Sequence, residues 1–215
     1  GISRVRGLGA PFPPNPNPHD PKGEKLDQWR PIATADDFFL PGCLARKVAA
    51  IDAAPDIALV FAATQIIAPD GRPLLLRRPF RTDRVLDGAT LARRSFRVKN
   101  IYGEPSNVLF RRDLVARLGS YAPDLSYSVD WELWIRLSCQ ARVAYLATPF
   151  TAFRISDSSV TGALRWQSFR SDDASFVRRV RTDARLPLTR LDLLLHQITQ
   201  PSRMLLRTLW LRRHL

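Results

Sequence analysis

The fold is decided by the stretch from Thr34 to Leu74, which is TADDFFLPGCLARKVAAIDAAPDIALVFAATQIIAPDGRPL. In the segment PGCLARKVAAIDAA, Leu44, Val48 and Ile51 recur at helical spacing, and prolines flank the segment on both sides. The run that follows, IALVFAATQII, is apolar and rich in β-forming residues, and it leads into a Pro-Asp-Gly turn. This pattern predicts a helix followed by one or two partly buried strands, an alternation that is typical of an α/β fold.

Helices and strands are predicted to alternate through the rest of the chain. Strands are expected at 107–110, 142–147 and 151–154, and helices at 111–118, 130–140, 164–181 and 188–200, with a last helical piece after Pro201. The basic stretch from Arg72 to Lys99 has a weak pattern, which predicts a loop with a short helix near 88–94. The predicted fold class is therefore α/β, with a C-terminal helical tail over residues 166–215.

The composition is that of an ordinary globular protein. The 215 residues are 45% apolar and 25% charged, which excludes collagen-like, coiled-coil and wholly disordered classes. Residues 10–21, APFPPNPNPHDP, hold six prolines, so a regular helix or a central strand is excluded there. We therefore expect an extended or disordered arm over residues 1–30, with Trp29 attaching its end to the domain that begins near Pro31.

The net charge is the unusual feature of the composition. The chain has 33 basic and 20 acidic residues, a net charge of +13, and most of the cations are arginines. Such a charge favours anionic partners, which include nucleic acid, anionic lipid and phosphorylated substrates. A genome that prefers arginine codons explains the same count without any such partner.

Two further features indicate a cytoplasmic protein. The chain lacks an apolar run of the roughly 18 to 20 residues that a membrane-spanning helix needs, and its basic first residues are not followed by the apolar segment of a secretory signal. Its two cysteines, Cys43 and Cys139, are too few for a disulfide scaffold and are typical of reduced thiols.

Two acidic motifs are candidates for chemistry. Asp36 and Asp37 stand between a short apolar segment and a helix, where carboxylates suit a hard cation such as Mn²⁺ or Mg²⁺. The alternative is that both residues cap the helix that follows. Asp130 opens the helix DWELWIRLSCQ, where a partly buried carboxylate suits a general base. Its alternative is an N-cap residue followed by two core tryptophans.

Two loop motifs offer polar contacts. In GEPSN, a Gly-Pro turn presents Glu104 and Ser106 at the end of a strand. In FRISDSSVTG, Arg154 and the hydroxyl groups after it suit a phosphate. Arg136, further along the Asp130 helix, suits a carboxylate or a diphosphate. Each motif is also compatible with an ordinary solvated loop or a structural ion pair.

As an ordered set, these motifs resemble the second half of a family 2 glycosyltransferase of the GT-A fold. The resemblance covers about residues 31 to 165, from TADDFFLPG through GEPSNVLFRR, LGSY and DWELWIRL to FRISDSSVTG. It implies an incomplete GT-A domain with a Rossmann-like mixed sheet. Such a domain is normally preceded by a nucleotide-binding half of roughly 80 to 90 residues, so we expect this chain to be a fragment or a degenerate member of the family.

The resemblance also implies roles for single residues. On the donor side, Asp37 would bind the metal at the diphosphate, Asp36 would face the ribose or the metal's waters, and Arg154 would contact the diphosphate. On the acceptor side, Asp130 would be the catalytic base. The remaining predicted residues of the acceptor and sugar pocket are Glu104, Ser106, Trp131 and Arg136.

The implied activity is an inverting transfer of one sugar. The donor would be a nucleotide sugar, the acceptor a glycan or a lipid-linked hydroxyl, and the cofactor Mn²⁺ or Mg²⁺. A Gln-x-x-Arg-Trp motif, which processive relatives use, does not occur in the sequence, which favours a non-processive enzyme. Thr34 and Ser156 depart from the family pattern, because many relatives have Asp and His there, and a weaker metal affinity is expected.

The C-terminal tail supports a competing hypothesis. From Phe176 to Leu215, nine arginines stand against Asp183 and Asp192, a net charge of +7. An interrupted apolar stripe is formed by Leu188, Leu191, Leu195, Ile198, Leu205, Leu209 and Trp210. An interfacial helix on an anionic membrane has this pattern. A helix packed on the domain with its arginines in solvent has it too. The alternative function is thus a non-enzymatic basic module that binds an anionic surface, either a membrane or nucleic acid. For the enzyme, no specific nucleic acid is expected as a partner.

Overall fold

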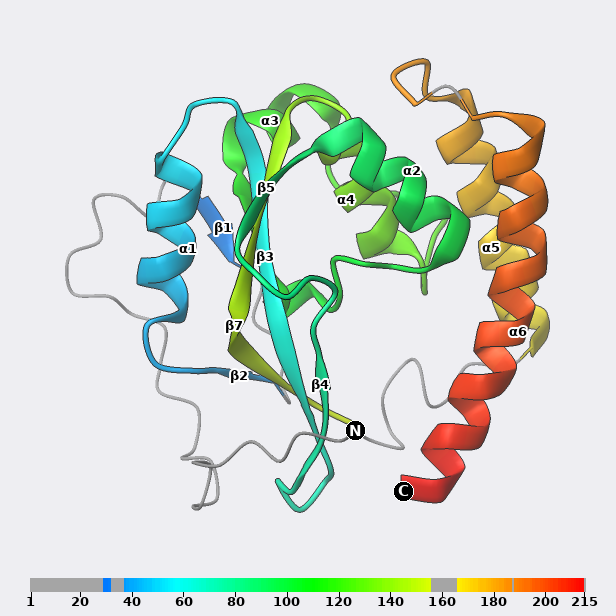
Figure 1. Ribbon diagram of the computed structural model, residues 1–215. Coiled ribbons are helices and arrows are strands. Elements are labelled where there is room, and N and C mark those ends of the chain that lie inside the picture. The colour runs from blue at the N-terminus through cyan, green and yellow to red at the C-terminus, as the bar shows by residue number, and fades with distance from the viewer. Residues whose placement is uncertain (1–28, 32–36, 156–165, 187, 215) are drawn as a thin grey trace.

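The computed structural model describes residues 29–31, 37–155, 166–186 and 188–214. They form an α/β fold around one mixed, open sheet of seven strands (Figure 1). The strand order is β1-β6-β3-β7-β2, with β4 paired to β3 and β5 paired to β7. The strands are β1 Trp29–Pro31, β2 Phe38–Phe39, β3 Ile57–Ile67, β4 Pro73–Arg77, β5 Arg84–Asp87, β6 Val108–Arg111 and β7 Arg142–Arg154.

The centre of the sheet is the parallel pair of β3 and β7. Every residue of β3 is buried, which explains why its sequence is a continuous apolar run instead of an alternating one. β1, β2 and β6 are antiparallel to their neighbours. The expected contact of Trp29 with the domain is confirmed, because Trp29 pairs with Arg111 of β6.

Helices cover both faces of the sheet (Figure 1). The helices are α1 Cys43–Asp52, α2 Gly88–Val98, α3 Arg112–Leu118, α4 Val129–Ser138, α5 Trp166–Thr182 and α6 Arg190–His214, with a 3₁₀ turn η2 at Pro105–Asn107. α1 buries Cys43 and Ile51 against one face. The larger core lies on the other face, where α2, α4 and α5 contribute Phe96, Trp134 and Phe176.

The structure corrects three predicted elements. The stretch from Arg72 to Lys99 contains two strands as well as a full helix, because β4 and β5 are held by pairing with β3 and β7 and not by their own apolar pattern. Residues 142–154 form one strand, and residues 190–214 form one helix that continues through Pro201. A proline removes one backbone donor, and directly before this position α6 is held to α2 by Gln200, which donates to the carbonyl oxygen of Val98.

α5 and α6 belong to the same packed body as the sheet. Phe176 of α5 stacks on Trp131 of α4, with ring centroids 4.5 Å apart. Asp192 of α6 is fully buried and accepts hydrogen bonds from Arg93 and Arg97 of α2. Burial by itself would raise the pKa of Asp192, but hydrogen bonds from Arg93, Thr189 and Arg97 outweigh it and hold this pKa well below the ordinary value.

Replacing Asp192 by Asn is expected to lower the free energy of unfolding by about 3 kcal/mol, because the substitution breaks a buried ion pair and leaves two guanidinium groups facing it. Since the folded-state pKa is depressed, this stabilisation is present above about pH 4 and is lost as the pH falls further. Urea unfolding at pH 7 and at pH 3 measures both effects. Asp113→Asn, in an exposed ion pair with Arg117, is the control and should change the stability by less than about 0.5 kcal/mol.

Candidate functional site

The candidate site lies at the edge of the sheet where the parallel strands β3 and β7 end. Open α/β sheets bind ligands outside the carboxyl ends of their parallel strands. β2 is antiparallel to β7, and Phe38 pairs with Ala152, near the end of β7. Asp37, which directly precedes β2, therefore lies at this carboxyl edge.

Asp37 is held by a hydrogen bond from a distant loop. Its side chain is nearly buried, and the Ser106 hydroxyl donates to its Oδ2 at 2.6 Å. The alternative that Asp37 caps α1 is wrong, because the N-cap of α1 is Gly42 and no side chain caps that helix. The sequence placed Asp37 on the donor side and Ser106 in the acceptor and sugar pocket, whereas in the structure the two side chains are in direct contact.

Lys47 lies behind this pair, whereas the sequence of α1 predicted it on the outward side of the helix with Arg46 and Asp52, so that prediction is wrong. It is fully buried on α1, and its Nζ donates to the carbonyl oxygen of Ser106 at 3.4 Å. Burial lowers the pKa of Lys47. The spacing carried a signal of this burial, because Lys47 is four residues from both Cys43 and Ile51 and shares their buried face of α1.

Glu104 is fixed by an ion pair. Both of its carboxylate oxygens accept from the Arg77 guanidinium, whose Nη2 also donates to the Thr64 hydroxyl at 3.1 Å. Gly103 permits this approach, since a Cβ there would lie 2.2 Å from Arg77 Nη2. The Glu104 carboxylate therefore helps to fix the loop that carries Ser106.

Asn107 is a second residue that the sequence did not predict. Its side-chain Nδ2 donates to the carbonyls of Ala62 and Tyr102 at 2.7 and 2.9 Å, and its Oδ1 accepts from the backbone N–H of Ala62 at 3.2 Å. Ala62 and Asn107 lie next to Phe61 and Val108, the pair at which the pairing of β3 with β6 ends. The amide thus takes the place of a regular strand partner and fixes η2 against the sheet.

Arg154 lies at the same edge, at the end of β7. Its guanidinium stands over the Phe38 ring, 4.9 Å from the centroid, and donates to the carbonyl oxygen of Pro69 in the turn after β3. The contact with Phe38 brings Arg154 beside the residue that follows Asp37. The predicted donor-side residues Asp37 and Arg154 are therefore brought to one place by the pairing of β2 with β7.

Asp130 lies in the first turn of α4. The N-cap of α4 is Ser128, so the alternative that Asp130 is the N-cap residue is wrong. The Ser138 carbonyl at the other end of α4 lies against Gly88, and Asp87 pairs with Arg142 at the start of β7. The C-terminal end of α4 is thus near the start of β7, and Asp130 lies about 12 Å from Ser138, toward the other end of the helix.

The surroundings of Asp130 change its proton affinity. Burial raises the pKa of Asp130 from 3.8 to about 6. Tyr121 lies close to this carboxylate. Burial raises the pKa of Tyr121, and the negative charge of Asp130 raises it further. A carboxylate with a pKa near neutrality can accept a proton and release it again at physiological pH.

α5 fixes the loop that leads into α4. Asp172 accepts hydrogen bonds from the backbone N–H groups of Ser126, Tyr127 and Ser128 at 2.6, 3.0 and 2.8 Å. These bonds hold the chain just before Asp130. This link between the helical tail and the candidate base was not predicted, because it joins residues more than 40 positions apart.

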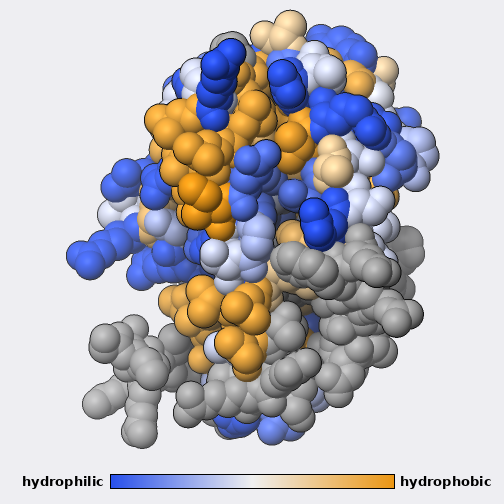
Figure 2. Space-filling model, turned by 90° about the vertical axis from the view of Figure 1, so that its right-hand side faces the viewer, coloured by the Kyte–Doolittle hydropathy of each residue, from blue (hydrophilic) through white to orange (hydrophobic). Residues whose placement is uncertain are grey.

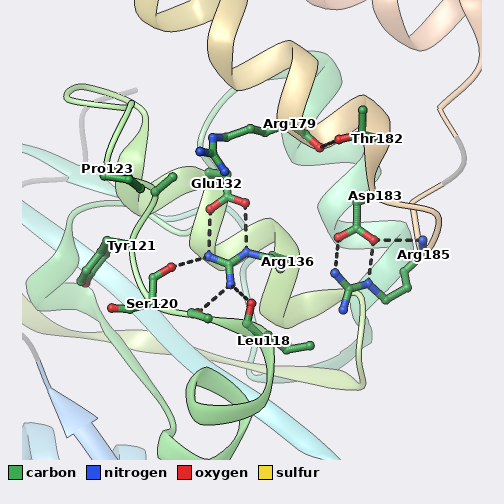
Figure 3. Close-up of a pocket in the computed structure, with 12 residues that line it drawn as sticks. Leu118, Ser120, Tyr121, Pro123, Glu132, Arg136, Arg179, Thr182, Asp183 and Arg185 are labelled. Atoms are coloured by element: carbon green, nitrogen blue, oxygen red, sulfur yellow. Dashed lines mark hydrogen bonds and ion pairs between the residues drawn. The ribbon is translucent and has the colours of Figure 1, made fainter.

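The side chains of Trp131 and Arg136 make their polar contacts within the protein. Trp131 is buried, and its indole N–H donates to the Ser95 hydroxyl at 2.8 Å. Arg136 pairs with Glu132 and donates to the carbonyls of Leu118, Gly119 and Ser120 (Figure 3). These contacts close the C-terminal end of α3 and make Arg136 part of the scaffold.

The same Arg136 lines a pocket of about 450 Å³ that also contains Arg179, Asp183 and Arg185 (Figure 3). Arg185 is paired with Asp183, and Arg179 with Asp124. The lining charges are thus largely matched within the protein. Of the predicted site residues, Arg136 alone is among those that line this pocket.

The carboxylate oxygens of Asp37 are ligands of the kind that a hard cation prefers. Mg²⁺ and Mn²⁺ at phosphate sites are commonly held by one or two carboxylates, with phosphates and waters as the other ligands. Within the described ranges, no group of three or more His, Cys, Asp or Glu side chains could hold a metal. The predicted partner Asp36 and the two departures from the family pattern, Thr34 and Ser156, lie outside the described residues.

Comparisons with known proteins give no relative. No protein family matches the chain, and no curated protein matches its sequence. The similarity to family 2 glycosyltransferases therefore stays a prediction, which depends on the ordered motifs.

Proposed function

We propose that this chain is a glycosyltransferase of the GT-A type, which moves a sugar from a nucleotide-sugar donor to an acceptor hydroxyl with inversion. One observation carries the proposal. Asp130, in the first turn of α4, has a partly buried carboxyl group with a pKa of about 6, and the buried Asp37 carboxylate lies at the carboxyl edge of the sheet. Transfer needs two separate acidic groups, one for the donor diphosphate and one for the acceptor proton.

The donor side would consist of Asp37 and Arg154, with Ser106 holding the Asp37 carboxylate in place. Asp37 would bind Mn²⁺ or Mg²⁺, which when bound neutralises charge on a nucleoside diphosphate. Arg154 is anchored over Phe38, so its guanidinium needs little reordering to face a phosphate. Lys47 behind Ser106 supports this loop through the hydrogen bond from its Nζ to the Ser106 carbonyl oxygen.

The acceptor side would be Asp130. Its carboxylate takes the proton of the acceptor hydroxyl, the hydroxyl oxygen forms a bond to the anomeric carbon, and the bond from that carbon to the diphosphate oxygen breaks. The electron pair leaves with the nucleoside diphosphate. Because the pKa of Asp130 is about 6, the group is mostly ionised at pH 7 and is more basic than an ordinary Asp.

Calorimetric titration with UDP and GDP, with and without Mn²⁺, tests the donor site. We expect binding that needs Mn²⁺ and that falls at least about tenfold in Asp37→Asn, because the substitution removes the charge that a cation would meet. Asp70→Asn is the matched control, since Asp70 lies in the exposed turn after β3 and should leave binding unchanged. Binding that is equal in both variants, or that ignores Mn²⁺, would contradict the proposal.

Salt separates this function from the alternative of a basic module on an anionic surface. Association of arginines with a polyanion falls steeply as the salt concentration rises. A site built around Asp37 depends mainly on Mn²⁺ and keeps most of its affinity between low and physiological salt. Titrations at both salt concentrations therefore distinguish the two functions.

A further inference from the structure

α6 is packed with its polar side inward. Asp192, His196 and Gln200 are buried on this helix. His196 Nδ1 lies 2.8 Å from the carbonyl oxygen of Phe96, and its Nε2 lies 2.9 Å from Asp173. Gln200 donates to the carbonyl oxygen of Val98 at 3.3 Å. α6 is thus held to α2 by ion pairs and hydrogen bonds, an unusual way to dock a helix that is rich in leucine.

Most leucines of α6 point outward instead, although Leu193 packs against the main core. Six large apolar side chains of the helix are each more than half exposed, and we call them the α6 apolar stripe. They are Leu191, Leu194, Ile198, Leu205, Leu206 and Leu209, with exposures from 51% to 66%. Figure 2 shows this side of the molecule, where hydrophobic side chains gather and hydrophilic ones surround them.

This arrangement corrects one expectation from the sequence. A helix packed on the domain was expected to have its leucines inward and its arginines in solvent. The spacing of Leu191, Leu194, Ile198, Leu205 and Leu209 places them on one side of α6, over a length of about 27 Å. An exposed apolar surface of this extent marks an interaction site.

The charges of α6 indicate the kind of partner. The helix sequence has five arginines and a single acidic residue, Asp192, which is buried and paired with two arginines of α2. No exposed carboxylate is therefore available on the described length of α6. A second copy of the helix would bring arginines against arginines, whereas an anionic surface complements them.

We propose that α6 docks this protein on an anionic lipid bilayer surface, with the apolar stripe inserted among the acyl chains and the exposed Arg190 at the headgroups. Interfacial helices combine an apolar face with a basic one in this way. None of the helices in the described part of the chain is long and apolar enough to cross a membrane. The helix lies along the surface, and its buried polar face stays on α2.

Vesicle co-sedimentation of the full chain tests the proposal. The vesicles consist of phosphatidylcholine alone, or of phosphatidylcholine and phosphatidylglycerol in equal parts. We expect binding to the anionic vesicles, at least about tenfold weaker in the double variant Leu194→Gln, Ile198→Gln, because two inserted side chains are lost. Both side chains are more than half exposed, so the fold should persist, which circular dichroism checks.

The matched control is the double variant Leu75→Gln, Val85→Gln. These side chains are 52% and 51% exposed, but they belong to β4 and β5, so vesicle binding should be unchanged. The proposal is wrong if the unmodified chain binds neither vesicle, or if both double variants lose binding equally. It is also overturned if salt abolishes the binding while the α6 variant retains it, because arginines alone would then make the contact.

Sedimentation velocity tests whether a second copy of the chain covers the α6 apolar stripe. If the unmodified chain is a dimer and the Leu194, Ile198 variant is a monomer, a second copy covers the stripe and the lipid proposal falls. The Asp37→Asn variant should bind vesicles as the unmodified chain does, since Asp37 is not part of α6. A failure of the membrane proposal is therefore distinguishable from a failure of the donor site.

Discussion

Sugar transfer in Asp130→Asn is expected to fall by about 10² to 10⁴ in kcat, while metal-dependent nucleotide binding is unchanged. The amide of Asn cannot take the acceptor proton, but it has almost the same shape as the carboxylate. Release of UDP or GDP from a nucleotide sugar measures the rate, and calorimetry measures the binding. If transfer persists, Asp130 only supports the start of α4, and the base is a different group.

The pH dependence of kcat/KM is an independent test of Asp130 as the base. If the Asp130 carboxylate is the base, kcat/KM rises with pH and levels off above an apparent pKa of about 6. In Asp130→Asn, this rise of kcat/KM with pH is expected to be absent. A profile that is flat between pH 5 and 7 in the unmodified chain would exclude Asp130 as the base.

The same substitution should stabilise the fold near neutral pH. The folded-state pKa of Asp130 is raised, so the unfolded chain loses this proton first, and stability falls as the pH rises from about 4 to about 6. Asn has no carboxyl group to ionise, so this destabilisation is absent in Asp130→Asn. We expect its free energy of unfolding to be higher by about 1 kcal/mol at pH 7, a value discounted for partial exposure to solvent. Higher stability with lower activity is the expected signature of a functional carboxyl group.

The largest loss of stability is expected for Gly88→Ala. A Cβ at Gly88 would lie 2.0 Å from the carbonyl oxygen of Ser138 and 2.1 Å from that of Ala141. Both atoms are backbone, so they cannot move away as a flexible side chain would. We expect the free energy of unfolding to fall by about 3 kcal/mol or more, as in an overpacked core. Urea unfolding measures it.

Gly71→Ala is the comparison for this prediction. Gly71 has a φ of 86°, which favours glycine, but a Cβ there would meet nothing within 4 Å. Only the backbone strain of about 1 kcal/mol is then expected. Equal losses in the two variants would show that the contact between α2 and the end of α4 is not tight. Because that contact fixes the direction of α4, Gly88→Ala should also displace Asp130 and lower activity.

Much of the fold follows from local patterns. The apolar run of β3 and the spacing of α1 and α4 predicted these elements near their observed bounds, because buried strands and helices need such sequences wherever they pack. β4 and β5 lack a pattern of their own, so they were not predicted. They exist through pairing with strands that are distant in sequence, which a local pattern does not encode.

The candidate site divides in the same way. By itself, the sequence determined that acidic groups stand before α1 and at the start of α4, because residue type and position in an element are local properties. Only the tertiary structure decided that Ser106 holds Asp37, that Lys47 and Asn107 support this loop, and that Arg136 belongs to the scaffold. It also decided which side of α6 is buried. A helical pattern shows that a stripe exists, but long-range hydrogen bonds to α2 determined that the stripe faces outward.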